Sequence, residues 1–336
     1  MTDDDARNPD RSTPTGGDTP GRPGEEDDSE SLFDFLRSLD TEQRNPRSMR
    51  IDLAEAGEIA RLINEEDQKV APAVKKRLPE IARAIEAVRA ALASGGRLIY
   101  AGAGTSGRLG VLDAAECPPT FGTDPDRVQG LIAGGREAMF VAQEGAEDFE
   151  ENGRKAMEDI GLNSYDILIG LAASGRTPYV HGALREAAER GCLTVMVTTV
   201  PGEQVRLEVD IMIDVPVGPE VIMGSTRMKS ATAQKMVLNM ISTGAMVRLG
   251  KIYENVMVDL QLTNRKLHER ARRILMLFSN LDYEGADRAM KASGGNVKVA
   301  LVMTLGEVER PEAERLLARN DGFVRRTLHE LGVDSS

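Results

Sequence analysis

The sequence predicts an α/β fold: a doubly wound, five-stranded parallel sheet with N-terminal helices and a small C-terminal helical module. Five short apolar runs alternate with stretches of helical pattern or turn residues over the middle of the chain. The runs are continuously apolar, as strands covered by helices on both faces require. They fall at residues 98–101, 128–133, 167–171, 193–198 and 211–215.

Helical periodicity precedes and follows these runs. Between residues 51 and 93, apolar side chains recur three and four positions apart. Beyond residue 225 the pattern is helical nearly to the end of the chain. Residues 228–249 form a long amphipathic candidate, in which Met236, Met240 and Met246 are typical of a core or a subunit interface.

Composition and charge exclude several classes of partner. The 336 residues are 41% hydrophobic, which is enough to bury a core. The net charge is −12, and residues 1–30 supply −7 of it. An acidic chain without a basic stripe is a poor partner for nucleic acid or anionic lipid. With no apolar run of eighteen residues and no signal-like N-terminus, the sequence predicts no membrane segment and a cytoplasmic location.

The sequence predicts no metal site. Cys117 and Cys192 lie far apart and lack the spacing of metal ligands. The three histidines, His181, His268 and His329, do not cluster with them along the chain.

A glycine-rich loop follows the first predicted strand. Residues 102–108, GAGTSGR, run into a predicted helix, so that backbone N–H groups at the helix N-terminus would face an anion. The letters also satisfy the dinucleotide pattern GxGxxG, but residues 133–135, AGG, stand where that fold places an acidic residue. The hydroxyls of Thr105 and Ser106, beside Gly104, suit a polyhydroxylated sugar. We therefore interpret the loop as a sugar-phosphate cradle rather than a nicotinamide site.

A second loop of the same kind follows the third predicted strand. It contains Ser174, Gly175, Arg176 and Thr177, and Pro178 opens the next helix. Ligands of open α/β sheets bind at the carboxyl ends of the strands, where the strand order switches. The two loops are therefore expected to lie near one crevice, one holding the sugar and the other the phosphate.

A third segment, residues 224–229, places Ser225 and two cations before the long helix. Taken singly, each loop is more often an ordinary capping turn, because Ser, Thr and Gly are common at strand-to-helix junctions. Three such loops in one chain favour a binding site.

The first loop belongs to a longer signature. GAGTSGRLG at 102–110 and DAAECPPT at 113–120 are similar to the signature of the N-acetylmuramic acid 6-phosphate etherases. Further matches are TEQRNP at 41–46, NEED at 64–67, EGAED at 144–148, ASGRTPYV at 173–180 and AQK at 233–235. The resemblance runs from about residue 41 to the end of the chain.

The resemblance implies a sugar isomerase (SIS) fold, a homodimer and a carbon–oxygen lyase. Its reaction would cleave the D-lactyl ether of N-acetylmuramic acid 6-phosphate by elimination and water addition, giving N-acetylglucosamine 6-phosphate and D-lactate. The family's acid/base pair falls on Glu116 and Glu147. The implied role is amino-sugar catabolism in cell-wall peptidoglycan recycling, with no cofactor, because elimination needs no redox chemistry.

With this resemblance the chain divides into four expected parts. Residues 1–40 are expected to be a disordered acidic tail, because residues 1–30 have almost no apolar side chains to offset the entropy of ordering. A helical segment, 41–95, packs on the core, and residues 96–265 form the SIS sugar-phosphate-binding domain. Residues 266–336 form a helical, UBA-like module.

Spacing alone would not single out either glutamate. Pro118 is expected to end the helix that carries Glu116, and Glu147 is expected to share a helical face with Glu144. His268, on a charged helix, is more often a surface residue than a group delivered from a neighbouring subunit for ring opening.

Two other functions fit the same loops. An aldose–ketose isomerase of sugar phosphates would shuttle one proton between C1 and C2 and needs no leaving group. A non-catalytic sensor would bind the sugar phosphate and leave it intact. Turnover and product analysis separate the three.

Overall fold

The computed structural model describes residues 40–143, 145–262 and 264–333. The predicted disordered tail therefore lies, apart from Asp40, outside the described residues. Within those ranges, none of the helices combines the length and the apolar character needed to cross a membrane.

A five-stranded parallel sheet forms the centre of the fold, as predicted. Its strands lie in the order β2-β1-β3-β4-β5, and each hydrogen-bonded pair is parallel. Each predicted apolar run coincides with a strand to within one residue. The bounds are β1 (Leu98–Gly102), β2 (Val128–Ile132), β3 (Ile167–Leu171), β4 (Leu193–Thr198) and β5 (Ile211–Asp214).

Helices precede, connect and follow the strands. Before and within the sheet they are α2 (Ala56–Asp67), α3 (Val70–Lys75), α4 (Leu78–Ala93), α5 (Gly104–Phe121), α6 (Glu150–Asp159) and α7 (Pro178–Glu189). After it come α8 (Lys229–Arg248), α9 (Arg265–Phe278), α10 (Tyr283–Ala292), α11 (Val297–Gly306), α12 (Arg310–Arg319) and α13 (Val324–Glu330).

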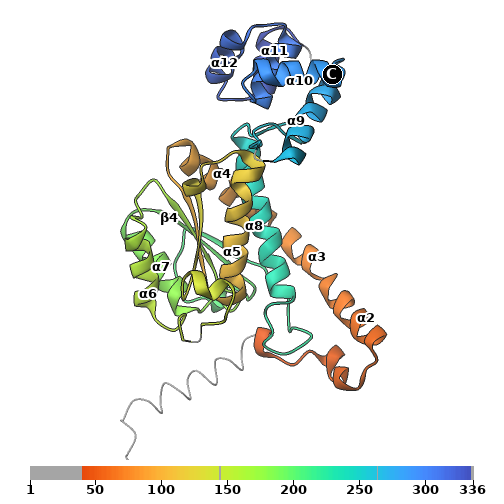
Figure 1. Cartoon of the computed structure of the whole chain (residues 1–336). Coiled ribbons are helices and arrows are strands. Elements are labelled where there is room, and N and C mark those ends of the chain that lie inside the picture. Colours follow the sequence, from red (N-terminus) through yellow and green to blue (C-terminus); the bar gives the residue numbers. More distant parts are fainter. Residues whose placement is uncertain (1–39, 144, 263, 334–336) are drawn as a thin grey trace, which may run out of the picture. The chain divides into compact units, whose positions relative to one another are not determined.

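Both faces of the sheet are covered by helices, which is why the strands are continuously apolar (Figure 1). Leu98 and Tyr100 point to the face packed by α4, α5 and α8, where they join one buried apolar cluster. On the other face Gly170 lies against α7, because a Cβ there would meet the side chains of Leu184 at 2.6 Å and Val180 at 2.7 Å. Alternate residues of each strand thus belong to different cores.

Helix α5 runs past Pro118, which was expected to stop it. Pro118 and Pro119 lie inside the helix, which ends only at Phe121 and is capped by Gly122. Gly122 adopts a left-handed conformation (φ 62°) and donates its N–H to the Pro118 carbonyl. The last turn persists because Cys117 and Phe121 are buried in the core cluster. The prediction that the helix ends at Pro118 was therefore wrong: burial outweighs the lost backbone hydrogen bonds.

The region after β5 is helical as predicted, with one exception. The long candidate at 228–249 is α8, and its Met246 is fully buried in the core. Two short antiparallel strands, β6 (Ile252–Tyr253) and β7 (Val256–Met257), follow it and interrupt the predicted helical stretch. Glu254, with φ 52°, begins their two-residue turn.

Helices α9 to α13 form a second apolar cluster together with Tyr253, Val258 and Leu260 from the segment before them. Asn264, Asp282 and Asn296 cap α9, α10 and α11, each side chain accepting the N–H of the residue three positions on.

Candidate active site

The two predicted loops lie side by side at the carboxyl edge of the sheet. They follow β1 and β3, which are neighbours and pair Gly102 with Leu171 at their ends. The strand order reverses between these two strands, since β2 lies beyond β1 and β4 beyond β3. The prediction that both loops meet at one switch point of the sheet is confirmed.

The first loop passes directly into α5, whose first residue is Gly104. Among the described residues, no side chain caps the N-terminus of this helix. Gly104 has φ 50° and open space where a Cβ would stand, whereas a Cβ at Gly107 would lie 2.7 Å from the Gly102 carbonyl oxygen. The Ser106 hydroxyl is buried and donates to Gln234 Oε1 of α8 at 2.8 Å. Only Thr105 and the start of the helix are thus presented to a ligand.

The second loop is held by its own backbone. Gly175 has φ 72° and is tightly enclosed, since a Cβ there would lie 2.6 Å from a Val205 methyl. A ring nitrogen of His181, one turn into α7, lies 2.8 Å from the Gly175 carbonyl oxygen, and burial lowers the pKa of this histidine. The Arg176 N–H donates to Ser174 Oγ at 3.4 Å. Thr177 precedes α7, and no side chain in the described ranges caps that helix.

Glu147 connects the two loops. Together with Gly104 and Arg108 it lines a cavity of about 170 Å³, here called the loop cavity. Its other lining residues are Ala103, Ala133, Ala138, Ala142, Gln143 and Gly145. The Glu147 carbonyl also accepts the N–H of Tyr179 in α7 at 3.0 Å. This backbone hydrogen bond fixes the glutamate beside the second loop, while the cavity places it beside the first.

The local structure at Glu147 differs from the expectation. The residue lies in a turn over residues 145–147 rather than on a helix, and Gly145 has φ 73°. The glycine gives the chain a sharp reversal that a helical face would not allow. The side chain is exposed, but the protein around it removes enough water to raise the pKa of the carboxyl, and the charge of Asp148 adds to this.

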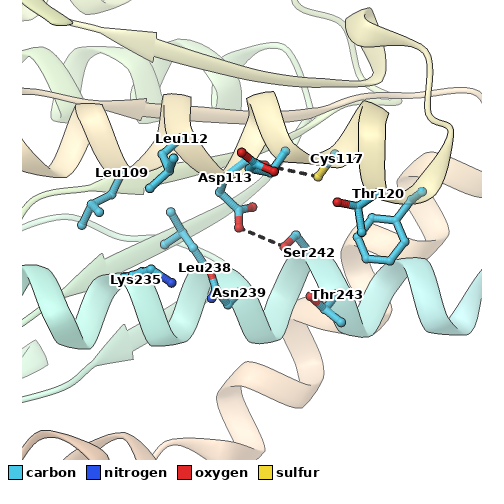
Figure 2. A pocket seen from close by; sticks show the side chains of 12 residues that line it. Leu109, Leu112, Asp113, Cys117, Thr120, Lys235, Leu238, Asn239, Ser242 and Thr243 are labelled. Atoms are coloured by element: carbon cyan, nitrogen blue, oxygen red, sulfur yellow. Dashed lines mark hydrogen bonds between the residues drawn. The ribbon is translucent and has the colours of Figure 1, made fainter. Parts of the chain in front are cut away.

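Glu116 lies elsewhere, in a cavity of about 320 Å³ between α5 and α8, here called the α5–α8 cavity. Figure 2 shows side chains of the two helices facing each other across it. From α5 it is lined by Leu109, Leu112, Asp113, Glu116, Cys117, Thr120 and Phe121, and from α8 by Lys235, Leu238, Asn239, Ser242 and Thr243. Glu116 itself is exposed.

A buried carboxyl forms the inner wall of the α5–α8 cavity. Asp113 accepts hydrogen bonds from the Tyr100 hydroxyl at 2.8 Å and from the Ser242 hydroxyl at 3.1 Å (Figure 2 draws the second). Burial raises the pKa of Asp113, although both hydrogen bonds oppose the shift. Burial likewise raises the pKa of Cys117 to about 12, so this thiol is not a nucleophile at neutral pH.

The two cavities have no lining residue in common. Glu116 lies twelve residues beyond Gly104 on the same helix, which separates their backbones by about 18 Å. Within one protomer, the structure therefore does not bring Glu116 and Glu147 to one point.

Polar groups of the third predicted segment, residues 224–229, are largely paired with other groups of the protein. The carboxylate of Glu220 accepts the N–H groups of Lys229 and Ser230 at 3.0 and 2.9 Å, so it occupies the N-terminus of α8. Lys229 is buried and paired with Glu66 at 2.8 Å. Burial opposes ionisation of Glu66, but hydrogen bonds from Lys229 and Lys69 lower its pKa to about 2.

Ser225 lies before this network. It is partly exposed, and within the described ranges it makes no hydrogen bond to either loop. The backbone around it instead contacts the N-terminal segment, as Gly224 donates its N–H to the Thr41 carbonyl at 3.1 Å.

His268 is exposed on α9 and lines a separate cavity with Arg272 and Asp287. Over residues 40–143, 145–262 and 264–333, no cluster of three or more His, Cys, Asp or Glu side chains is arranged to hold a metal ion.

Several residues at these sites had no role in the sequence interpretation. Arg108, Asp113, Gln234 and Lys235 all fall within the quoted signature segments, but nothing in their spacing assigns them to a cavity. The available signal was helical periodicity, since Asp113 and Glu116 are three residues apart and therefore share a face of α5.

Comparison with known proteins gives a consistent family. The profile of the glucokinase regulatory protein N-terminal SIS domain matches residues 80–188. An N-acetylmuramic acid 6-phosphate etherase from Salinibacter ruber is 58% identical over 299 residues, covering 89% of this chain and 96% of that protein. Another from Caldanaerobacter subterraneus subsp. tengcongensis is 52% identical over 289 residues, covering 86% of this chain and 94% of that protein.

Solved structures give a weaker likeness. A phosphoheptose isomerase from Francisella tularensis has a TM-score of 0.43 and 18% identity, covering 57% of this chain and 97% of that one. The sequence relatives are enough to assign the family, because they span nearly the whole described chain at more than 50% identity. The chain belongs to the N-acetylmuramic acid 6-phosphate etherase family.

Proposed function

We propose that this protein is a lyase that cleaves the D-lactyl ether of N-acetylmuramic acid 6-phosphate, releasing D-lactate and N-acetylglucosamine 6-phosphate. The carrying observation is the identity of 58% and 52% to two etherases over nearly their full lengths. The position of Glu147 between the two loops supports it. The corresponding role is amino-sugar catabolism in peptidoglycan recycling, in the cytoplasm.

The two loops divide the substrate between them. Ser174, Gly175, Arg176 and Thr177 hold the 6-phosphate, because two hydroxyls and a guanidinium suit its acceptor oxygens. On the other side of Glu147, Gly104, the Thr105 hydroxyl and the backbone of Ser106 at the start of α5 hold the sugar. Ser225 is retained as a further contact at the edge of the site.

The chemistry is elimination followed by addition of water. With the sugar ring open, C2 is next to an aldehyde, so a base removes its proton while the lactyl oxygen leaves C3 with a proton from an acid. Water then adds to C3. Glu116 and Glu147 form the acid/base pair, and their unlike surroundings suit it, since one carboxyl must be ionised while the other is protonated.

This pair requires two protomers. Because Glu116 and Glu147 lie in different cavities of one chain, we place Glu116 in the site of a second copy. An apolar groove between α4 and α8, lined by Leu78, Ile85, Met236 and Met240, borders the α5–α8 cavity through Asn239 and Thr243. We place this groove in the interface of the homodimer, because it adjoins the cavity that contains Glu116.

We also retain the four-part division of the chain, with its SIS domain at 96–265 and a helical, UBA-like module at 266–336. The apolar cluster of α9 to α13 supports a separate C-terminal module, although Tyr253, Val258 and Leu260, which lie before residue 266, also belong to it. The ligands are a small sugar phosphate and a second copy of the chain.

The test is incubation of the purified protein with N-acetylmuramic acid 6-phosphate in water enriched in ¹⁸O. Mass spectrometry should find unlabelled D-lactate, and the label at C3 of the sugar. Isomerised sugar without lactate would favour the aldose–ketose isomerase. Tight binding without any turnover would favour the sensor.

A further inference from the structure

The substrate of the proposed function carries two anions, and only one of them has a binding site so far. The second is the carboxylate of the lactyl group, which leaves with the product. A site for this second anion presupposes the proposed function. A buried or half-buried cation near Glu147 that lacks a carboxylate partner would be the group to receive it.

Arg108 meets this description. It lies one turn into α5, is half-buried, and lines the loop cavity together with Glu147. Its guanidinium is held in place by two backbone carbonyls: Nε donates to Met139 at 3.0 Å and Nη2 to Ala138 at 2.6 Å. An arginine fixed in this way loses little side-chain entropy when it binds a further acceptor.

Among the described residues, no side chain neutralises its charge. Over the described ranges, no carboxylate lies within ion-pair distance of Arg108, and Nη1 makes no hydrogen bond. Other arginines around the sheet differ in this respect, since Arg97 pairs with Asp166 at 2.6 Å and Arg154 with Glu186 at 2.9 Å. Arg108 alone among these three combines a fixed guanidinium with neutral partners and a cavity.

The loop cavity contains the groups that a lactyl ether would need. Gly104 marks the sugar side, Glu147 provides a carboxyl, and Arg108 provides a planar pair of N–H donors. A carboxylate two bonds from the ether oxygen would reach the guanidinium while C2 and C3 stay beside the glutamate.

We infer that Arg108 is the specificity-determining residue for the lactyl carboxylate. It binds this carboxylate by hydrogen bonds from Nη1 and Nη2 and thereby orients the C3–O bond for cleavage. It transfers no proton, and the lactate leaves with the charge it had in the substrate.

The experiment compares two substrates, N-acetylmuramic acid 6-phosphate and its lactyl carboxamide, in which the carboxylate is replaced by a neutral amide. Release of D-lactate or D-lactamide is measured for the wild type, Arg108→Gln and Arg108→Lys. We expect Arg108→Gln to raise KM for the acid about 10-fold to 100-fold, the range of one charge-assisted hydrogen bond, while KM for the amide changes little. The KM of Arg108→Lys for the acid should lie between those of the wild type and Arg108→Gln, because lysine keeps the charge without the planar donors.

The matched control is Arg136→Gln, an exposed arginine just outside the loop cavity that should leave both KM values unchanged. An equal rise in KM for both substrates in Arg108→Gln would overturn the inference, since a phosphate contact or a purely structural role predicts such an equal rise. If Arg108→Gln does not fold, the two wild-type KM values test the inference instead. Equal wild-type KM values for the acid and the amide would also overturn the inference. A wild type that releases neither lactate nor lactamide would instead overturn the proposed function.

Discussion

The loop cavity and the α5–α8 cavity each contain one glutamate of the proposed pair, but they are built differently. The loop cavity is formed by turns at the carboxyl edge of the sheet, and its polar groups, Arg108 and Glu147, have no carboxylate or cation partner within ion-pair distance among the described residues. The α5–α8 cavity is formed by two packed helices, and its inner carboxyl, Asp113, is satisfied by two hydroxyl donors. The first is therefore prepared for a ligand, whereas the inner wall of the second is part of the core.

Removal of either carboxyl should change the activity most. Glu147→Gln and Glu116→Gln should each lower kcat about 10²-fold to 10⁴-fold, the usual contribution of a general acid or base. Steady-state lactate release measures this, with Glu137→Gln as an exposed control on the same segment of the chain as the loop cavity. A Glu116 variant that keeps its kcat would leave the α5–α8 cavity with no role in the reaction.

The next effect tests whether the two cavities meet across a dimer. When the inactive variants Glu116→Gln and Glu147→Gln are unfolded, mixed and refolded together, half of the dimers are mixed. Each mixed dimer contains one intact composite site, so activity should return to about one quarter of the wild type. If both glutamates act within one protomer, no intact site forms and the mixture stays inactive.

A smaller effect concerns the inner wall of the α5–α8 cavity. Tyr100→Phe leaves the buried Asp113 carboxyl without one of its two donors, and we expect a loss of about 1–3 kcal/mol in the free energy of unfolding. Urea unfolding measures it. The control is Tyr165→Phe, whose side chain is 66% exposed and which should be neutral. Equal stabilities of the two variants would show that Asp113 does not depend on this donor.

The weakest effect concerns the charge of Glu147. Its pKa is raised in the folded state, so the folded protein binds the proton more tightly than the unfolded chain. Between the unfolded pKa of about 4.3 and the raised folded value, stability therefore falls as the pH rises. Glu147→Gln should have a higher Tm than the wild type at pH 7 and the same Tm at pH 4. A Tm difference independent of pH would contradict the raised pKa.

Much of this fold could be predicted from local patterns in the sequence. The strands were found because each is a continuous apolar run, and the two loops were expected together because the carboxyl ends of parallel strands lie on one edge. The errors arose where burial or a turn outweighed local preference. Phe121 holds α5 together beyond its prolines, and Gly145 turns the chain at Glu147, where a helix was expected.

The partners of charged residues could not be predicted from the sequence. Glu66 and Lys229 are 163 positions apart, and Glu220 reaches the N-terminus of α8 from the loop before it. Neither contact leaves a periodic signal, so the third loop resembled an anion site although the protein's own carboxylate already occupies the helix end.

The amino-acid sequence by itself determines the parallel sheet, the two loops at its edge and the family signature. Apolar periodicity and turn chemistry are local properties of the chain. Packing, in contrast, selects which polar groups remain open to a ligand. It fills the start of α8, separates Glu116 from Glu147 and leaves Arg108 without a carboxylate among the described residues, since these outcomes depend on how elements distant in sequence pack against one another.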